Sequence, residues 1–217
     1  MMSWTSWFRR QDLYIVGANY MMTRLVVNIS QVYLPFFVTV TLRLNDTAVA
    51  IAPLIVYVAS LVATSVVRPL TARIGRSLTY AIGATLAAGA CVGFLLIPQG
   101  NSATGLVYFC AAILGLGNAT IMVTSVSLEA DMVGKNTETG AFVYGILSLT
   151  DKLSNGIAIL IIQIMDESLC PESKGSEHFY RIVIGCIPLV SAVGGAIFAV
   201  LTPMFAGKRF ASAQTTQ

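Results

Sequence analysis

Charged residues are scarce in this sequence. Only 11% of its 217 residues are Asp, Glu, Lys or Arg, whereas 56% are hydrophobic. Water-soluble domains contain about 25% charged residues. The composition therefore excludes a water-soluble globular domain and predicts a chain that lies mainly in a lipid bilayer.

The residues and motifs of several common active sites are missing as well. The single histidine, His178, lies in a polar stretch, and the four cysteines lack C-x-x-C spacing, so we expect no metal centre. A net charge of only +3 argues against a nucleic-acid partner. Neither a G-x-x-x-x-G-K-S/T motif nor a Ser–His or paired-acid set lies in the apolar runs. We therefore expect no activity driven by ATP hydrolysis, no enzyme activity and no cofactor.

Long apolar runs are abundant. A helix that crosses the hydrocarbon core needs about 20 mostly apolar residues. The sequence predicts an all-α polytopic membrane protein whose region 13–204 is a six-helix bundle, with spans at residues 13–42, 48–67, 78–97, 103–126, 141–165 and 182–204. Residues 1–12 and 205–217 are expected to form a cytoplasmic segment and a cytoplasmic tail.

The distribution of basic residues predicts the orientation, because short cytoplasmic loops are enriched in Lys and Arg. One side of the predicted bundle carries Arg9, Arg10, Arg68, Arg73, Arg76, Lys135, Lys208 and Arg209. The other side carries only Arg43, Lys174 and Arg181. We therefore predict that both termini face the cytoplasm.

Polar side chains form a stripe on the first predicted span. Its members are spaced four, four and three residues apart, which places them on one helical face: Tyr20, Arg24, Asn28 and Gln31. Arg24 falls near the middle of the membrane, where an ionised side chain costs about 3 kcal/mol.

A second stripe lies on the fifth predicted span, at matching depth. It contains Tyr144, Ser148, Asp151 and Asn155, with Lys152 projecting about 100° from Asp151. Two stripes at one depth favour the lining of a polar cavity. The alternative is a structural ion pair between Arg24 and Asp151 that fixes helix packing.

Asn118, on the fourth span, has two equally weighted interpretations. It follows Gly115-Leu-Gly117. Asn118 either joins the cavity lining, or serves with the glycines in close helix packing.

The runs SLEADMVGKNTETGAFVYG at 127–145 and DKLSNG at 151–156 resemble the glycoside-pentoside-hexuronide:cation symporter branch of the major facilitator superfamily. The resemblance extends over nearly the whole chain. It implies a fold of twelve helices in two halves, in which this chain corresponds to helices seven to twelve. In that fold the seventh, eighth, tenth and eleventh helices line the cavity, and Lys152 matches a lysine near the cation and sugar sites.

The same resemblance implies a cytoplasmic gate. Arg73-Ile-Gly75-Arg76 is similar to the basic end of the superfamily's gating motif, and the resemblance adds Asp131, Thr139 and Gly140. The chain departs from that motif at Ala72 and Arg68, where an acid and a glycine are expected.

The function that the resemblance implies is secondary active transport of a small polar solute. The solute would be either cysteine carried into lysosome-related organelles or a sugar carried with a cation, H+ or Na+, in a lysosomal or plasma membrane. Alternating access needs an opposing bundle. The expected partners are therefore the lipid bilayer, the solute, and either the N-terminal six-helix half of the same full-length chain or a second copy. The alternative function is a non-transporting half that acts as a structural membrane component.

Overall fold

The structure is a computed structural model that describes residues 7–100, 103–134, 137–169 and 176–205. These ranges contain six long helices and no β-strand. The first helix passes directly into a short π-helix, η1. The elements are α2 (Gln11–Phe36), η1 (Phe37–Thr41), α3 (Asp46–Ile74), α4 (Arg76–Leu96), α5 (Ala103–Val133), α6 (Thr137–Leu169) and α7 (Ser176–Phe205).

All six helices are long and apolar enough to cross a membrane. Each predicted apolar window falls on one helix, and the first extends from α2 through η1. Four helices are clearly longer than predicted: α3 continues to Ile74, α5 continues to Val133, α6 runs from Thr137 to Leu169, and α7 begins already at Ser176. The positions of the bilayer boundaries, and the assignment of 1–12 and 205–217 to segments outside it, stay predictions.

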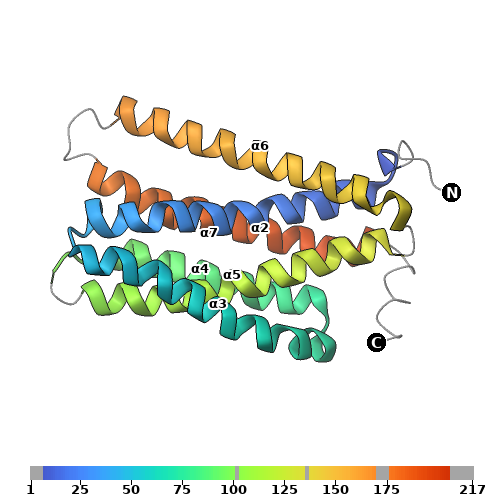
Figure 1. The fold of residues 1–217 in the computed structure, drawn as a ribbon, viewed down its shortest axis with the longest axis horizontal. Helices are drawn as coiled ribbons and strands as arrows, with labels where there is room; N and C mark the ends of the chain where they lie inside the picture. Colours follow the sequence, from blue (N-terminus) through green and yellow to red (C-terminus); the bar gives the residue numbers. More distant parts are fainter. Residues whose placement is uncertain (1–6, 101–102, 135–136, 170–175, 206–217) are drawn as a thin grey trace.

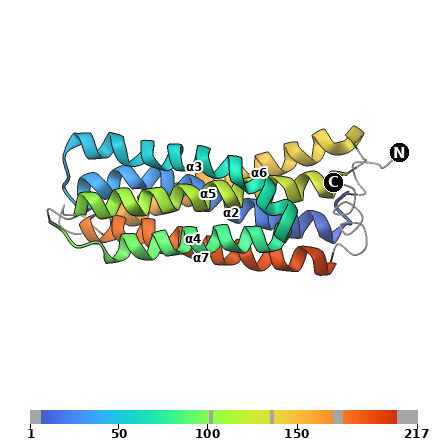
Figure 2. The ribbon, with the colours of Figure 1, turned by 90° about the horizontal axis from the view of Figure 1, so that it is seen from below.

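The helices are arranged in layers. Figure 2 shows α3 and α6 on one side of the bundle, α4 and α7 on the opposite side, and α2 and α5 between them. Figure 1 shows α6 at the edge of the bundle, beside α2. Of the six, α3 and α6 bury the smallest share of their apolar windows. The bundle therefore leaves much of α3 and α6 for contact with lipid or another bundle.

Glycines on α5 allow very close helix packing. A Cβ atom added at Gly115 would lie 2.3 Å from the carbonyl oxygen of Val56 on α3. One added at Gly117 would lie 2.6 Å from the backbone nitrogen of Ala87 on α4. Real Cβ atoms do not approach so closely, so both glycines serve the packing of α5 against its neighbours.

A buried hydrogen-bond network joins α2 to three other helices. Asn19 Nδ2 donates to the carbonyl oxygen of Gly195 on α7 at 2.8 Å, and Ser125 on α5 donates to Asn19 Oδ1 at 2.9 Å. The hydroxyl groups of Thr23 and Tyr80 lie 2.7 Å apart and join α2 to α4. The four side chains are fully buried. Hydrogen bonding removes the cost of burying these polar groups.

The helix α6 is held mainly by its two ends and by one site in between. Near its start, Val143 and Leu147 pack against Trp7 and Leu13. Near its end, the Tyr180 hydroxyl donates to Asp166 Oδ2 at 2.7 Å. The site between these ends involves Asp151 and is described below.

We predict that labels at both chain ends react only from the cytoplasmic side. The start of α2 and the end of α7 lie at the same end of the bundle (Figures 1 and 2). The described residues Arg68, Arg73 and Arg76 surround the α3–α4 junction at that end, whereas Lys135, Lys174, Lys208 and Arg209 lie outside the described residues.

The measurement is labelling of short tags at Met1 and Gln217 with a non-permeant reagent, before and after the organelle membrane is opened. A tag inserted in the loop between α6 and α7 serves as the control and should show the opposite accessibility. Terminal tags that react from the side of this loop would contradict the orientation.

Candidate functional site

Arg24 is the centre of a polar cluster between α2 and α6. Its Nε and Nη2 atoms donate to the Tyr20 hydroxyl at 2.9 and 2.7 Å, and its guanidinium lies over the Tyr20 ring. Arg24 Nε also lies 3.6 Å from Asp151 Oδ2. The side chain of Asp151 is only 6% exposed, whereas that of Arg24 is 29% exposed. An ion pair therefore joins two spans at the depth where the sequence placed both charges.

Asn155 completes the environment of Asp151. Its Nδ2 atom donates to Asp151 Oδ1 at 2.7 Å and to the carbonyl oxygen of Asp151 at 2.9 Å. Each carboxylate oxygen of Asp151 thus has one donor or cation beside it. Such pairing stabilises an ionised carboxylate in a buried position.

The other predicted members of the α6 stripe are not part of this cluster. Tyr144 is 41% exposed, and Ser148 and Lys152 are also exposed. Lys152 forms no ion pair with any residue of the described ranges. The angle of about 100° between adjacent helical positions directs it away from the Asp151 side of α6. Ser148 and Lys152 are therefore available for contact with lipid or with a partner bundle.

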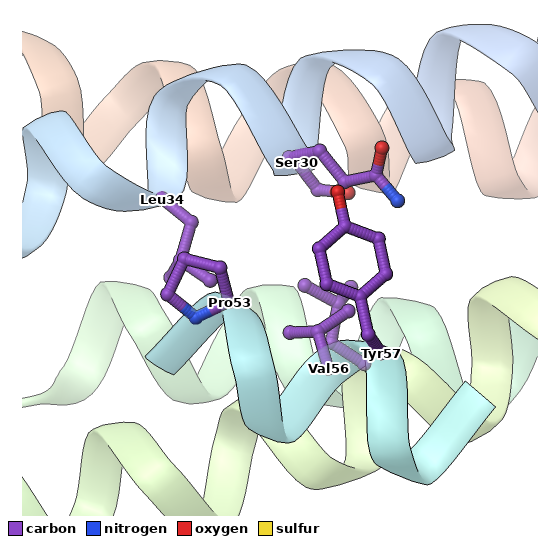
Figure 3. Close-up of a pocket in the computed structure, with 7 residues that line it drawn as sticks. Ser30, Leu34, Pro53, Val56 and Tyr57 are labelled. Atoms are coloured by element: carbon purple, nitrogen blue, oxygen red, sulfur yellow. The ribbon is translucent and has the colours of Figure 1, made fainter. Parts of the chain in front are cut away.

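Asn28 and Gln31 continue the α2 stripe toward the far end of the bundle, and both are half-buried. Gln31 lines a small cavity between α2, α3 and α5, together with Ser30, Leu34, Pro53, Val56, Tyr57 and Leu114. Figure 3 shows the Tyr57 side chain extending from α3 toward Ser30 on α2. The cavity is about 10 Å³ in volume, which is room for about one water molecule. It is too small for an organic solute in this arrangement.

Asn118 lies beside this cavity and is buried. It is 3% exposed, and its Nδ2 atom donates to the Ser30 hydroxyl at 3.2 Å. Its Oδ1 atom accepts no hydrogen bond from the described residues, and neither does Asn155 Oδ1. Buried oxygens without a donor are positions at which a water molecule or a polar solute can bind.

The predicted gate residues lie at the other end of these helices. Gly75 alone connects α3 and α4, with a φ of 82° that favours glycine. Arg76 forms an ion pair with Asp131 of α5 and donates to the carbonyl oxygen of Ser127. Arg73 is exposed. The ion pair therefore joins α4 and α5 within this bundle.

The two remaining gate residues lie in the first turn of α6. A Cβ atom at the buried Gly140 would lie 2.9 Å from the Val133 side chain, so this glycine permits close contact with α5. The side chain of Thr139 lies outside the described residues.

Glu129 is a buried acidic residue outside the site that the sequence predicts. The predicted fourth span ended at residue 126, but α5 continues and leaves Glu129 only 4% exposed. The sequence does contain a signal for the longer helix, because Leu128 and Met132 continue its apolar face. Both side chains are buried in the structure. The charged residues Glu129 and Asp131 interrupt the apolar run, so the helical periodicity of Leu128 and Met132 is less evident in the sequence.

Comparison with known proteins identifies similar sequences. Residues 1–206 match a family described as MFS/sugar transport protein. The chain is similar to proteins named "Major facilitator superfamily domain-containing protein 12". The Equus caballus protein is 36% identical over 188 residues, covering 85% of this chain and 39% of the relative. The Homo sapiens protein is 38% identical over 184 residues, covering 83% of this chain and 37% of the relative. The Mus musculus protein is 37% identical over 171 residues, covering 79% of this chain and 35% of the relative. The chain thus spans less than two-fifths of the length of these relatives.

Proposed function

This chain belongs to the MFS/sugar transport protein family, and on this premise we propose that it is one six-helix bundle of a secondary active transporter for a small polar solute. Members of the family are membrane transporters rather than enzymes. The predicted fold class is confirmed: six helices are long and apolar enough to span a membrane, as in half of a major facilitator transporter.

The observation that carries the proposal is the polar cluster in the middle of the bundle. Ionisable side chains within membrane spans face a bundle interior or a wet cavity and mark solute or ion pathways. Arg24 and Asp151 are such residues. The buried amide oxygens of Asn118 and Asn155, which lack donors among the described residues, add positions for a polar solute.

A transporter of this type needs a second bundle. Alternating access is a rocking of two bundles around a site at the midplane. The helices α3 and α6 lie on one side of the bundle (Figure 2) and carry Tyr57, Ser148 and Lys152 as exposed side chains. This side is suited to face a partner, which we propose to be either the N-terminal six-helix half of the same full-length chain or a second copy.

The solute and the coupling ion follow from the resemblance in the sequence. We propose cysteine or a sugar as the solute, and H+ or Na+ as the ion. The guanidinium of Arg24 would bind the carboxylate of an amino acid, whereas amide groups such as Asn28 and Asn118 suit the hydroxyl groups of a sugar. A lysosome-related or plasma membrane is the proposed location.

The structure also favours a second candidate, a non-transporting structural component. Its support is the Arg24–Asp151 ion pair, which lies on the same α2–α6 contact that holds α6 to the bundle. In this case the buried charges would serve only to hold the helices together.

Replacing Lys152 separates the two candidates. Lys152 is exposed and has no ion-pair partner in the described ranges, so Lys152→Ala should leave the folded yield unchanged. If Lys152 faces the solute or the coupling ion, loss of its charge should lower uptake about tenfold or more.

The measurement is uptake of labelled cysteine and of a labelled glycoside into vesicles that contain the complete transporter. The control is Arg9→Ala, which removes an exposed positive charge outside the polar cluster. Full uptake by Lys152→Ala would contradict a role of Lys152 in transport. Absence of uptake by the wild type as well, at a normal folded yield, would favour the structural candidate.

A further inference from the structure

Glu129 is a second acidic side chain that is buried inside the bundle, on α5. One turn before it on α5, Ser125 donates to Asn19 of α2. On the turn after it, Met132 packs in a cluster with Tyr20 and Leu147. Glu129, which is 4% exposed, is therefore placed where α5 meets α2 and α6.

The two buried carboxyl groups differ in their partners. Asp151 has Asn155 beside one oxygen and Arg24 beside the other. Glu129 interacts electrostatically with Arg24, but it has no hydrogen bond or ion pair with any residue in the described part of the chain. A carboxylate buried without a partner is costly, so the arrangement seen here suits a neutral Glu129.

The charged and titratable groups around Glu129 leave one carboxyl group in excess. From α2, Arg24 interacts electrostatically with it, and Arg24 is itself bonded to the Tyr20 hydroxyl. From α6, Asp151 pairs with the same Arg24, and Tyr144 interacts electrostatically with Glu129. The other neighbouring helices offer no further cation in the described ranges: Arg76 of α4 is paired with Asp131, Tyr80 is bonded to Thr23, and Arg68 and Arg73 of α3 are exposed.

We propose that Glu129 is a proton-binding site that decides which carboxylate Arg24 pairs with. When Glu129 carries the proton, it is neutral and Arg24 pairs with Asp151, as in this structure. When the proton leaves to water, the Glu129 carboxylate carries one negative charge and competes with Asp151 for Arg24. Proton binding would thus be coupled to the contact between α2, α5 and α6. The use of this step in transport rests on the proposed function, whereas the binding of the proton does not.

A proton fits this site better than a metal ion. A bound metal cation would require several oxygen ligands. No group of three or more potential ligand residues that could hold a metal ion occurs in the described ranges. The neighbouring guanidinium of Arg24 would also repel a second cation.

The test is infrared spectroscopy of the purified full chain in lipid vesicles. The C=O stretch of a protonated carboxyl group is recorded while the pH is changed, first in potassium chloride and then in sodium chloride. The variants are Glu129→Gln and the control Glu167→Gln, which removes an exposed glutamate from α6.

We expect the wild type to show a protonated carboxyl band near neutral pH that is the same in both salts. Glu129→Gln should lose the whole band, and Glu167→Gln should retain it. Retention of the band in Glu129→Gln would overturn the proposal. Loss of the band on changing potassium to sodium would also overturn it, because the site would then bind Na+ instead.

A second measurement covers the case in which Glu129→Gln does not fold. Wild-type protein made with isotope-labelled glutamate should show a shifted band, because the protonated group is a glutamate. An unshifted band would assign the proton to an aspartate and would refute the proposal. These readouts need no transport, so their failure is distinct from a failure of the uptake experiment with Lys152→Ala.

Discussion

Arg24→Ala should lower the yield of folded, inserted protein more than Asp151→Ala does, and the double variant should lose less than the sum of both. Removing one partner of a buried ion pair leaves the other charge without compensation, at a cost of about 3–5 kcal/mol. Arg24→Ala leaves Asp151, which is only 6% exposed. Asp151→Ala leaves an Arg24 that is 29% exposed and still bonded to Tyr20, so the cost should be smaller.

The measurement is a double-mutant cycle on the free energy of unfolding and on folded yield in detergent. Lys152→Ala is the matched control, because it removes a charge next to Asp151 without breaking a pair. Additive losses would show that Arg24 and Asp151 do not stabilise each other. If Arg24→Ala abolished uptake and left stability unchanged, the main role of Arg24 would be to bind the solute.

Gly115→Ala should separate α3 from α5. The added methyl group would lie 2.3 Å from the carbonyl oxygen of Val56 and 2.9 Å from the Cβ atom of Ala59. Backbone atoms of a packed helix move only when the helix moves. The Ser60 hydroxyl, which donates to the Gly115 carbonyl oxygen at 2.9 Å, would lose that bond as the helices part. We expect a loss of about 3 kcal/mol in stability, at the upper end of the range for overpacking.

The measurement is thermal unfolding of the purified protein. The matched control is Gly105→Ala on the same helix, where an added Cβ atom meets nothing within 4 Å. This variant should change stability by no more than about 1 kcal/mol. Ala59→Gly should not rescue Gly115→Ala, because the clash with the Val56 carbonyl remains. Rescue by Ala59→Gly would show that the methyl contact, and not the backbone, limits the approach of the helices.

Much of the fold was predictable from the sequence, because transmembrane helices must satisfy their backbone hydrogen bonds internally and carry long apolar runs. The pairing of Arg24 with Asp151 was one of the two interpretations that helical spacing and similar depth allow. That reasoning uses only positions along each helix, which the sequence contains.

Other parts of the site depend on which faces of the helices meet, and the sequence does not contain this information directly. The sequence allows Asn118 either to line a cavity or to serve with Gly115 and Gly117 in close packing, whereas the contacts of the two glycines depend on how α3 and α4 lie against α5. Glu129 was missed because its charge was taken to mark the end of a span. The burial of that charge depends on α2 and α6, which are distant in the sequence.

The ion pair between α2 and α6 also has a consequence for biogenesis. Among these helices α2 leaves the ribosome first, and α3, α4 and α5 follow before α6 with Asp151 is made. During this interval Arg24 has Tyr20 of its own helix beside it but lacks its acidic partner Asp151. A lone arginine favours water or the edge of the bilayer over its interior. The early helices would thus remain shallow or associated with the insertion machinery until α6 arrives, and α6 would complete the insertion of α2.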